Sequence, residues 1–152
     1  MTQSTQEAAI SQADRQRWMA LLARAEPTEL ERIGAEHGPL PTYRLPRPTE
    51  VGLTMVRGRV GGSGSRFNLG EMTVTRSVVQ LADQTTGVAY IMGRDRHKAE
   101  MAALLDACLQ TGQVPDSALA PIRDRLSSAQ ARRDAAVAST KVEFFTLVRG
   151  ED

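Results

Sequence analysis

Apolar residues recur at helical spacing near the start of the chain. The apolar residues at positions 18, 21, 22 and 25 follow the i, i+3, i+4, i+7 pattern of one helix face, which predicts a helix over residues 11–25. Ser11 followed by Asp14 is typical of a capping box at its start. Pro27 interrupts the pattern, and Thr28 with Glu31 indicates a second capping box that opens a short helix to about His37. We therefore expect an αα-hairpin at the N-terminus.

The pattern changes to an extended one in the middle of the chain. Residues 39–48 contain four prolines and predict a connector or an edge strand near Tyr43. From Val51 apolar and polar residues alternate, which predicts a strand with one buried face. A second strand is expected over residues 72–81, with a bulge or burial on both faces at Val78-Val79, and a third over 88–92. The short connections favour an antiparallel meander.

Helical spacing returns in the C-terminal half. Asp95 is a good N-cap for a helix to about Gln110, and Pro121 suits the first turn of a polar, alanine-rich helix to about Thr140. Residues 141–149, which include Phe144 and Phe145, have high β propensity and predict a last strand.

These elements predict an α+β fold with a central, mostly antiparallel sheet, an N-terminal helical hairpin and two helices in the C-terminal half. The length of 152 residues suits a single domain over residues 12–152, preceded by a flexible tail over residues 1–11. The start lacks a signal-peptide layout, and there is no apolar run of about 18 residues, so a cytoplasmic protein without a membrane span is expected.

Composition narrows the function classes. The formal net charge of +1 gives no field that would favour nucleic acid or an anionic membrane. All but two of the 19 basic residues are arginine, a residue suited to buried interfaces and oxyanions, although a coding bias would give the same excess. Cys108 lies in an apolar helical pattern and is expected in the core. The chain has only two histidines and no paired-cysteine motif, so a zinc site is not expected.

The segment from Arg57 to Arg76 is the most informative part of the chain. It holds a glycine-rich loop between two extended runs and arginines on both sides of it, with candidate contact residues Arg57, Arg59, Gly61, Gly62, Gly64, Arg66 and Arg76. Glycine lets a backbone approach another molecule closely, and arginine forks match phosphate oxygens. The loop is not a Walker A motif, because no GK[ST] follows it. The segment therefore fits either a phosphate or phosphonate contact or a tight protein interface.

A second candidate lies where the third strand becomes a helix. Arg94 and Asp95 stand at a helix N-terminus, which attracts anions, although a capped and solvated helix start explains them equally well. His97 could act in proton transfer, but no orienting partner or nucleophile is near it in the sequence, so we expect a surface histidine. The residues alone show no catalytic constellation and favour an assembly subunit.

Four blocks of the sequence carry a family resemblance. RQRWMALLARA, GLTMVRGRVGGSGSRFNLGEMTVTR, GVAYIMGRDRHKAEMAALLDA and VEFFTLVRG occur in the order and spacing of PhnG, the G subunits of the bacterial carbon–phosphorus lyase core complex. The resemblance covers nearly all of residues 14–151, except the proline-rich connector.

The resemblance implies a role in phosphonate catabolism. It implies a subunit that helps to form α-D-ribose 1-methylphosphonate 5-triphosphate from ATP and methylphosphonate, with release of adenine, together with the H and I subunits and an ATP-binding-cassette-like L subunit. The direct contact would be with the I subunit. The J subunit would hold the iron–sulfur cluster and S-adenosylmethionine, so this chain would bind no cofactor by itself. The residues alone leave open a stand-alone phosphate- or phosphonate-binding module, or a small enzyme acting on a phosphorylated substrate.

Overall fold

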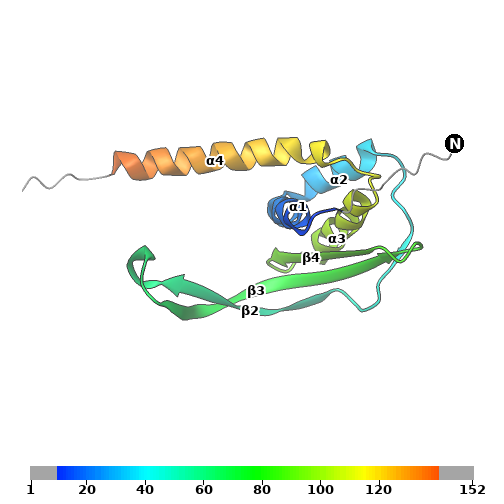
Figure 1. Cartoon of the computed structure of the whole chain (residues 1–152). Helices are drawn as coiled ribbons and strands as arrows, with labels where there is room; N and C mark the ends of the chain where they lie inside the picture. The colour runs from blue at the N-terminus through cyan, green and yellow to red at the C-terminus, as the bar shows by residue number, and fades with distance from the viewer. Residues whose placement is uncertain (1–9, 141–152) are drawn as a thin grey trace, which may run out of the picture.

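The computed structural model of the chain describes residues 10–140 (Figure 1). The predicted strand over 141–149, Phe144 and Phe145, and most of the predicted tail lie outside the described residues. The described part has an α+β fold, as predicted. Its main elements, in chain order, are α1 (Gln12–Arg24), α2 (Pro27–Glu36), β1 (Tyr43–Arg44), β2 (Glu50–Arg59), β3 (Arg66–Leu81), β4 (Thr86–Met92), α3 (Arg96–Gln110) and α4 (Ala120–Ser139).

The sheet is built around β3. β2, β3 and β4 run antiparallel to one another, which confirms the predicted meander. Gln80 of β3 pairs with Arg44 of β1 and also with Thr86 of β4, so β1 and β4 lie on opposite edges of β3. The short strand β1 confirms the edge strand that was expected near Tyr43.

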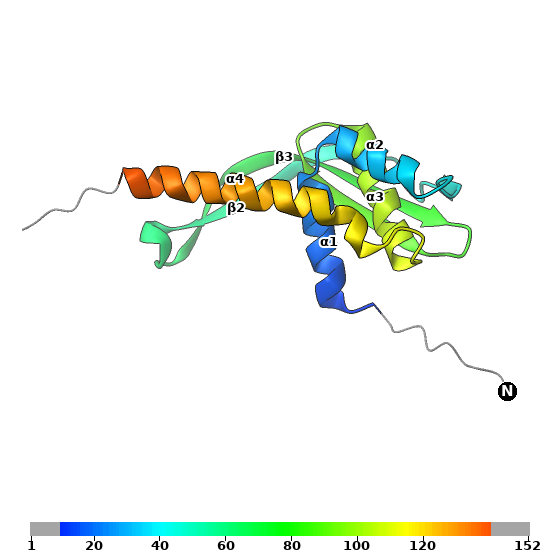
Figure 2. The ribbon, with the colours of Figure 1, turned by 90° about the horizontal axis from the view of Figure 1, so that it is seen from above.

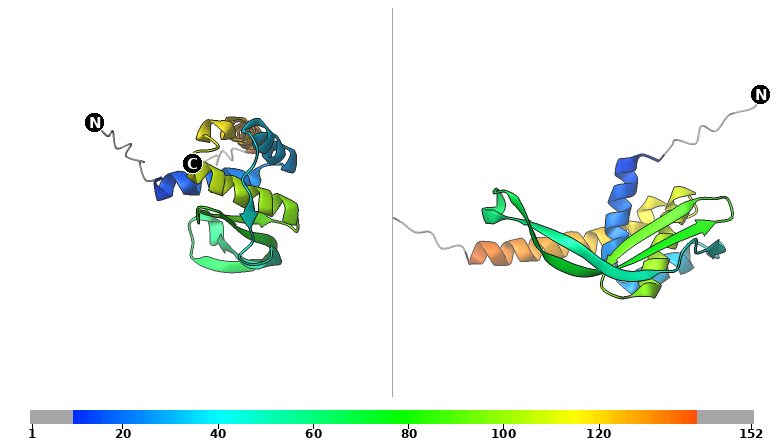
Figure 3. Two further views of the ribbon diagram at one scale, coloured as in Figure 1. Left: turned by 90° about the vertical axis from the view of Figure 1, so that its right-hand side faces the viewer. Right: turned by 90° about the horizontal axis from the view of Figure 1, so that it is seen from below.

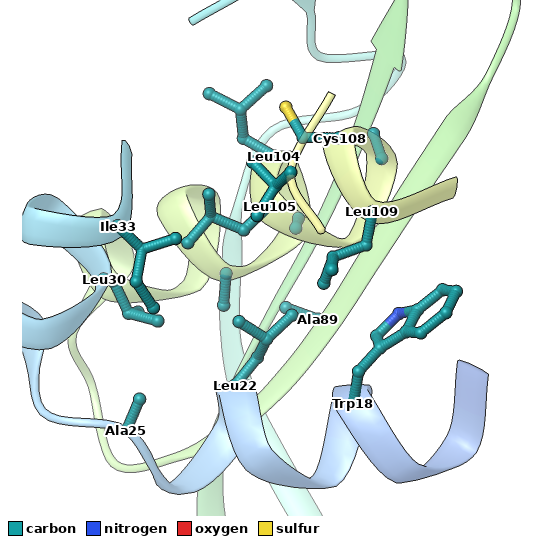
Figure 4. Close-up of a cluster of buried hydrophobic side chains, with 14 of the residues drawn as sticks. Trp18, Leu22, Ala25, Leu30, Ile33, Ala89, Leu104, Leu105, Cys108 and Leu109 are labelled. Carbon is teal, nitrogen blue, oxygen red and sulfur yellow. The ribbon is translucent and has the colours of Figure 1, made fainter. Parts of the chain in front are cut away.

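All four helices lie on one face of this sheet (Figures 1 and 3). α3 packs directly on β3 and β4, and α1 crosses beside it. Their facing side chains form the core, in which Trp18, Leu22, Leu105 and Ile33 are buried (Figure 4). Cys108 belongs to this core, and burial raises the pKa of its thiol to about 11. Cys108 is therefore the inert core residue that its apolar neighbours predicted.

The helix starts follow their capping residues. The Ser11 hydroxyl accepts a hydrogen bond from the Asp14 N–H at 3.1 Å, and Asp95 accepts one from the Lys98 N–H at 2.9 Å, as predicted. The predicted start of α2 is wrong. The capping box joins Glu26 to Glu29, and Pro27 occupies the first helical turn instead of breaking the helix. Proline fits there because its missing N–H would have no helical partner.

Most of the β2–β3 hairpin extends beyond the body of the protein. β4 ends at Met92, opposite Val74, so residues 53–73 form a two-stranded ribbon that we call the arm (Figures 1 and 3). The predicted buried face of β2 is wrong here, because Leu53 is 64% and Met55 48% exposed. Alternation in the sequence indicates that one face of a strand is apolar, but it does not indicate whether another part of the same chain covers that face.

The arm also changes two boundary predictions. Residues 66–71 belong to β3 and not to the preceding loop, which makes β3 a strand of 16 residues. Of the two alternatives predicted at Val78-Val79, the structure shows burial on both faces and no bulge, because both residues pair in regular register, with Val79 buried and Val78 half-buried. The register shifts instead between Val56 and Arg57, where Leu69 is the extra residue of β3.

α4 also extends away from the body, in the same direction as the arm (Figures 1 and 2). Pro121 lies in its first turn, as predicted. Ile122 is its one buried residue, and Leu126 packs against the core from the next turn. At about 1.5 Å per residue, a helix of this length spans roughly 30 Å, so most of it has no support from the described part of the chain.

Candidate functional site

Six of the predicted site residues lie together at the tip of the arm. Arg57 and Arg59 are on β2, Arg66 begins β3, and Gly61, Gly62 and Gly64 form the turn between the strands. Gly61 and Gly62 have φ values of 59° and 81°, which side chains rarely adopt. A Cβ on Gly64 would come within 2.6 Å of the Val60 carbonyl oxygen. The geometry of the turn therefore accounts for these three glycines by itself.

The tip is cationic. Arg59 pairs with Arg66 across the two strands, and the Arg59 guanidinium also donates to the Gly64 carbonyl at 3.3 Å. Arg57 stands two positions further from the turn, opposite Asn68. Like charges directly across a hairpin repel each other, so this arrangement costs stability unless an anion or an acidic partner compensates it.

The other three predicted site residues lie at the base of the arm. Arg76 forms an ion pair with Glu50 at 3.1 Å. Arg94 and Asp95 come directly after Gly93 in the chain. The Gly93 N–H donates a hydrogen bond to the Thr73 carbonyl, which places both residues beside the base of the arm. Thr73 and Arg66 are seven residues apart on β3, or roughly 23 Å at 3.3 Å per residue. The two groups therefore cannot hold the same phosphate, and whether either contacts a ligand or a partner stays a prediction.

The apolar surface of the arm was missed as a candidate site. Five large apolar side chains are exposed there, distributed over both faces of the ribbon: Leu53, Met55, Val60, Phe67 and Leu69. Phe67 and Leu69 lie together, because both would contact a Cβ placed on Gly58. The alternation around Leu53 and Met55 is a sequence signal for an apolar face, whereas Phe67 and Leu69 lie in residues predicted as loop.

A buried carboxylate was also missed. Asp106 of α3 has no exposed surface and accepts hydrogen bonds from Arg15, Trp18, Val88 and Gln110. The Trp18 indole N–H approaches to 2.7 Å and the Arg15 guanidinium to 2.8 Å. Every polar contact of this group is satisfied within the fold, so Asp106 connects α1, α3 and β4 as a structural residue.

The remaining candidates are not assembled into a reactive site. His97 is exposed and lies 3.4 Å from Glu31, which agrees with the expected surface histidine. Within residues 10–140 no group of three or more histidine, cysteine or acidic side chains could hold a metal ion. None of the helices described is both long and apolar enough to cross a membrane.

Comparison with known proteins decides the family. The family model described as "Phosphonate metabolism protein PhnG" matches residues 13–150. The chain belongs to the PhnG family. It is 40% identical over 143 residues to a protein of Rhizobium meliloti (strain 1021), and the match covers 92% of each chain. That relative is named alpha-D-ribose 1-methylphosphonate 5-triphosphate synthase subunit PhnG. The predicted membership is thus confirmed, and the arm and its glycine turn are features of a PhnG protein.

Proposed function

We propose that this chain is a non-autonomous subunit of α-D-ribose 1-methylphosphonate 5-triphosphate synthase and that its arm anchors it in the complex. The match to the Rhizobium synthase subunit over nearly the whole chain supports the first part. The exposed apolar side chains of the arm support the second and carry the proposal.

A projecting two-stranded arm needs another surface to pack against. A two-stranded hairpin is marginally stable in water at best, because neither of its faces is packed. Exposed apolar patches mark protein interaction sites, and a few buried anchor side chains, arginine among them, carry most of the binding energy of an interface. Phe67 and Leu69 supply anchors on one face of the ribbon. Leu53 supplies one on the other face, which also carries the cations Arg57 and Arg66.

The finer assignment of partners rests on the family resemblance. We propose the I subunit as the direct partner of the arm, within a core complex that also contains the H and J subunits and works with the L subunit. ATP would be a substrate of the complex, and the iron–sulfur cluster and S-adenosylmethionine would be held by the J subunit, in the cytoplasm. Cys108, the chain's one cysteine, is buried and has a raised thiol pKa, so it is unsuited to ligate a cluster.

The test is co-purification from a host that expresses the tagged chain with the other synthase subunits. Leu69→Ser and Phe67→Ser should each lower the yield of co-purified I subunit at least about tenfold, since an anchor residue contributes about 2 kcal/mol or more to binding. Tyr90→Ser is the matched control, because Tyr90 is 58% exposed but lies on β4 outside the arm. It should leave the yield unchanged.

The same preparation separates the proposal from its alternative. The isolated chain should show no turnover of ATP, whereas a stand-alone enzyme acting on a phosphorylated substrate would retain activity. The proposal is wrong if the arm variants co-purify as well as the unmodified chain, or if the purified chain alone turns over ATP.

A further inference from the structure

A groove separate from the arm lies between α4 and the body. Its volume is about 720 Å³, and it is bordered by the end of α1, the end of β4, the first turn of α3 and one stripe of α4. Leu21 and Leu126 give part of its lining an apolar character. A volume of this size falls in the usual range for small-molecule sites.

The charged side chains of the groove are mainly cations. Arg24, Lys98, Arg123 and Arg133 line it together with the single carboxylate Glu26. Glu26 forms the reciprocal capping box at the start of α2, so the N-terminal N–H groups of that helix already compensate its charge. The groove therefore carries an excess of positive charge, although the chain as a whole is nearly neutral.

Three of these cations have no carboxylate partner among the described residues, which is also true of the exposed Arg94 and Arg96, whereas four arginines elsewhere in the body are paired. Arg15, Arg32, Arg76 and Arg125 each form an ion pair with a carboxylate. In the groove Arg123 has such a partner, Asp116, at 3.1 Å. Among residues 10–140, no carboxylate lies within ion-pair distance of the other three, Arg24, Lys98 and Arg133. Three cations without counter-charges around one cavity are the arrangement expected of an anion site.

We propose that this groove binds a polyphosphate chain of the kind that an organic triphosphate carries. Arginine forks make bidentate hydrogen bonds to phosphate oxygens, and lysine adds a mobile point charge. Arg123 and Arg133 are ten residues apart on α4, or roughly 15 Å along the helix, so one phosphate cannot contact both. A chain of phosphates can reach from Arg24 and Lys98 at the body to Arg133 on α4. No residue of the arm lines this groove.

The experiment is calorimetric titration of the full-length chain, alone or co-purified with its partner subunits, with inorganic tripolyphosphate. Lys98→Gln and Arg133→Gln should each weaken binding about tenfold, the usual effect of losing one charge-assisted hydrogen bond. Their side chains make no tertiary hydrogen bond within residues 10–140, so the fold should be kept, as circular dichroism would verify. Arg17→Gln on the exposed side of α1 is the control and should bind normally. Arg59→Gln tests the tip of the arm, the other candidate phosphate contact, and should not weaken binding if the groove is the site.

Comparison of ligands then identifies the source of the anion. Orthophosphate should bind at least about tenfold more weakly than tripolyphosphate, because it reaches fewer cations. Binding of a nucleoside triphosphate as tight as that of tripolyphosphate indicates an organic triphosphate, and binding of tripolyphosphate alone indicates inorganic polyphosphate.

Three results would overturn the proposal: no binding of tripolyphosphate at millimolar concentration, equal binding of orthophosphate, or loss of binding in Arg59→Gln but not in Lys98→Gln. The outcome is independent of the function proposed above. Groove variants should still co-purify with the partner subunits, and arm variants should still bind tripolyphosphate.

Discussion

At the scale of single residues, Asp106 is the polar group on which the body depends. It is fully buried, and its carboxylate oxygens accept hydrogen bonds from side chains of α1 and α3 and from the backbone of β4. Moving a carboxylate out of water costs several kcal/mol, and only the full set of hydrogen bonds and the ion pair offsets that free energy. Arg15 is one of these partners and lies off the apolar stripe of α1. Its side chain is partly exposed and pairs with the buried Asp106 at the edge of the core.

Asp106→Ala should therefore lower the free energy of unfolding by roughly 3–5 kcal/mol, because it leaves the Trp18 and Val88 N–H groups without their acceptor. Urea unfolding followed by circular dichroism measures this difference. Asp134→Ala is a matched control on the exposed face of α4 and should change the free energy by less than about 0.5 kcal/mol. Equal effects of the two substitutions would contradict a structural role for Asp106.

Gly87 makes a second prediction at this scale. It lies on β4 beneath α3, and a Cβ added there would come within 1.9 Å of the Ala103 carbonyl oxygen. Since that atom belongs to helix backbone, α3 would have to move off the sheet. Gly87→Ala should destabilise the protein by about 3 kcal/mol or more, measured as a lowered melting temperature. Gly70→Ala on the arm is the control, because a Cβ there meets nothing within 4 Å. A similar melting temperature for both variants would show that α3 packs less closely than described.

At the scale of elements, α4 is held to the body by very few contacts. Besides Ile122 and Leu126, the main one is Arg125, which pairs with Glu29 of α2 at 2.7 Å and donates to the Arg24 carbonyl. The hydrogen bonds from Arg125 hold the pKa of the Glu29 carboxyl below its usual 4.5. This pair also positions the α4 side of the cationic groove.

The Glu29 pair gives α4 a dependence on pH. A carboxyl whose pKa is lowered by folding adds stability that is complete above its unfolded pKa and is lost as the pH falls through the folded value. Arg125→Gln should cost about 1 kcal/mol at pH 7, given the partial exposure of the pair, and clearly less at pH 3, where protonation of Glu29 is favoured. Urea unfolding at both pH values checks this. Arg123→Gln, whose partner Asp116 is exposed, should show a smaller difference at pH 7. A cost of Arg125→Gln that persists in full at pH 3 would argue against the ion pair.

Most elements could be predicted from local signals, because their causes are local. Ser11, Asp95 and Pro121 mark helix starts by chemistry within one turn, and the alternation around Val74 and Ile91 marks strands. The arm could not be predicted in the same way. Leu53 and Met55 have the pattern of a buried face, and only the end of β4 at Met92 decides that nothing in the described chain covers them.

The candidate site was predictable only in part for a related reason. The glycine turn and its arginines are adjacent in sequence, so the tip was found. Asp106 and Arg15 are 91 residues apart, and the groove joins Arg24, Lys98 and Arg133 from three helices. Such sets come together through the packing of α1, α3 and α4, which leaves no local pattern in the sequence.

At the scale of the whole molecule, the chain is a small packed body with two projections that the body does not support. The core joins α1, α2, α3 and the sheet, while the arm and the second half of α4 extend from it in the same direction (Figure 2). Neither projection buries enough apolar surface in the described chain to be stable by itself. Their order should therefore depend on assembly more than the order of the body does.

Hydrogen exchange measured by mass spectrometry tests this division directly. In the isolated chain, the backbone amides of residues 53–73 should exchange within seconds, while those of α3 stay protected for hours, since opening α3 requires breaking the core. In the co-purified complex, the amides of residues 53–73 should become protected by at least about a hundredfold, and those of α3 should change little. Leu69→Ser should abolish the gain on the arm, whereas Tyr90→Ser should keep it. Strong protection of the arm in the isolated chain would show that it needs no partner, and an unchanged arm in the complex would place the interface elsewhere on the molecule.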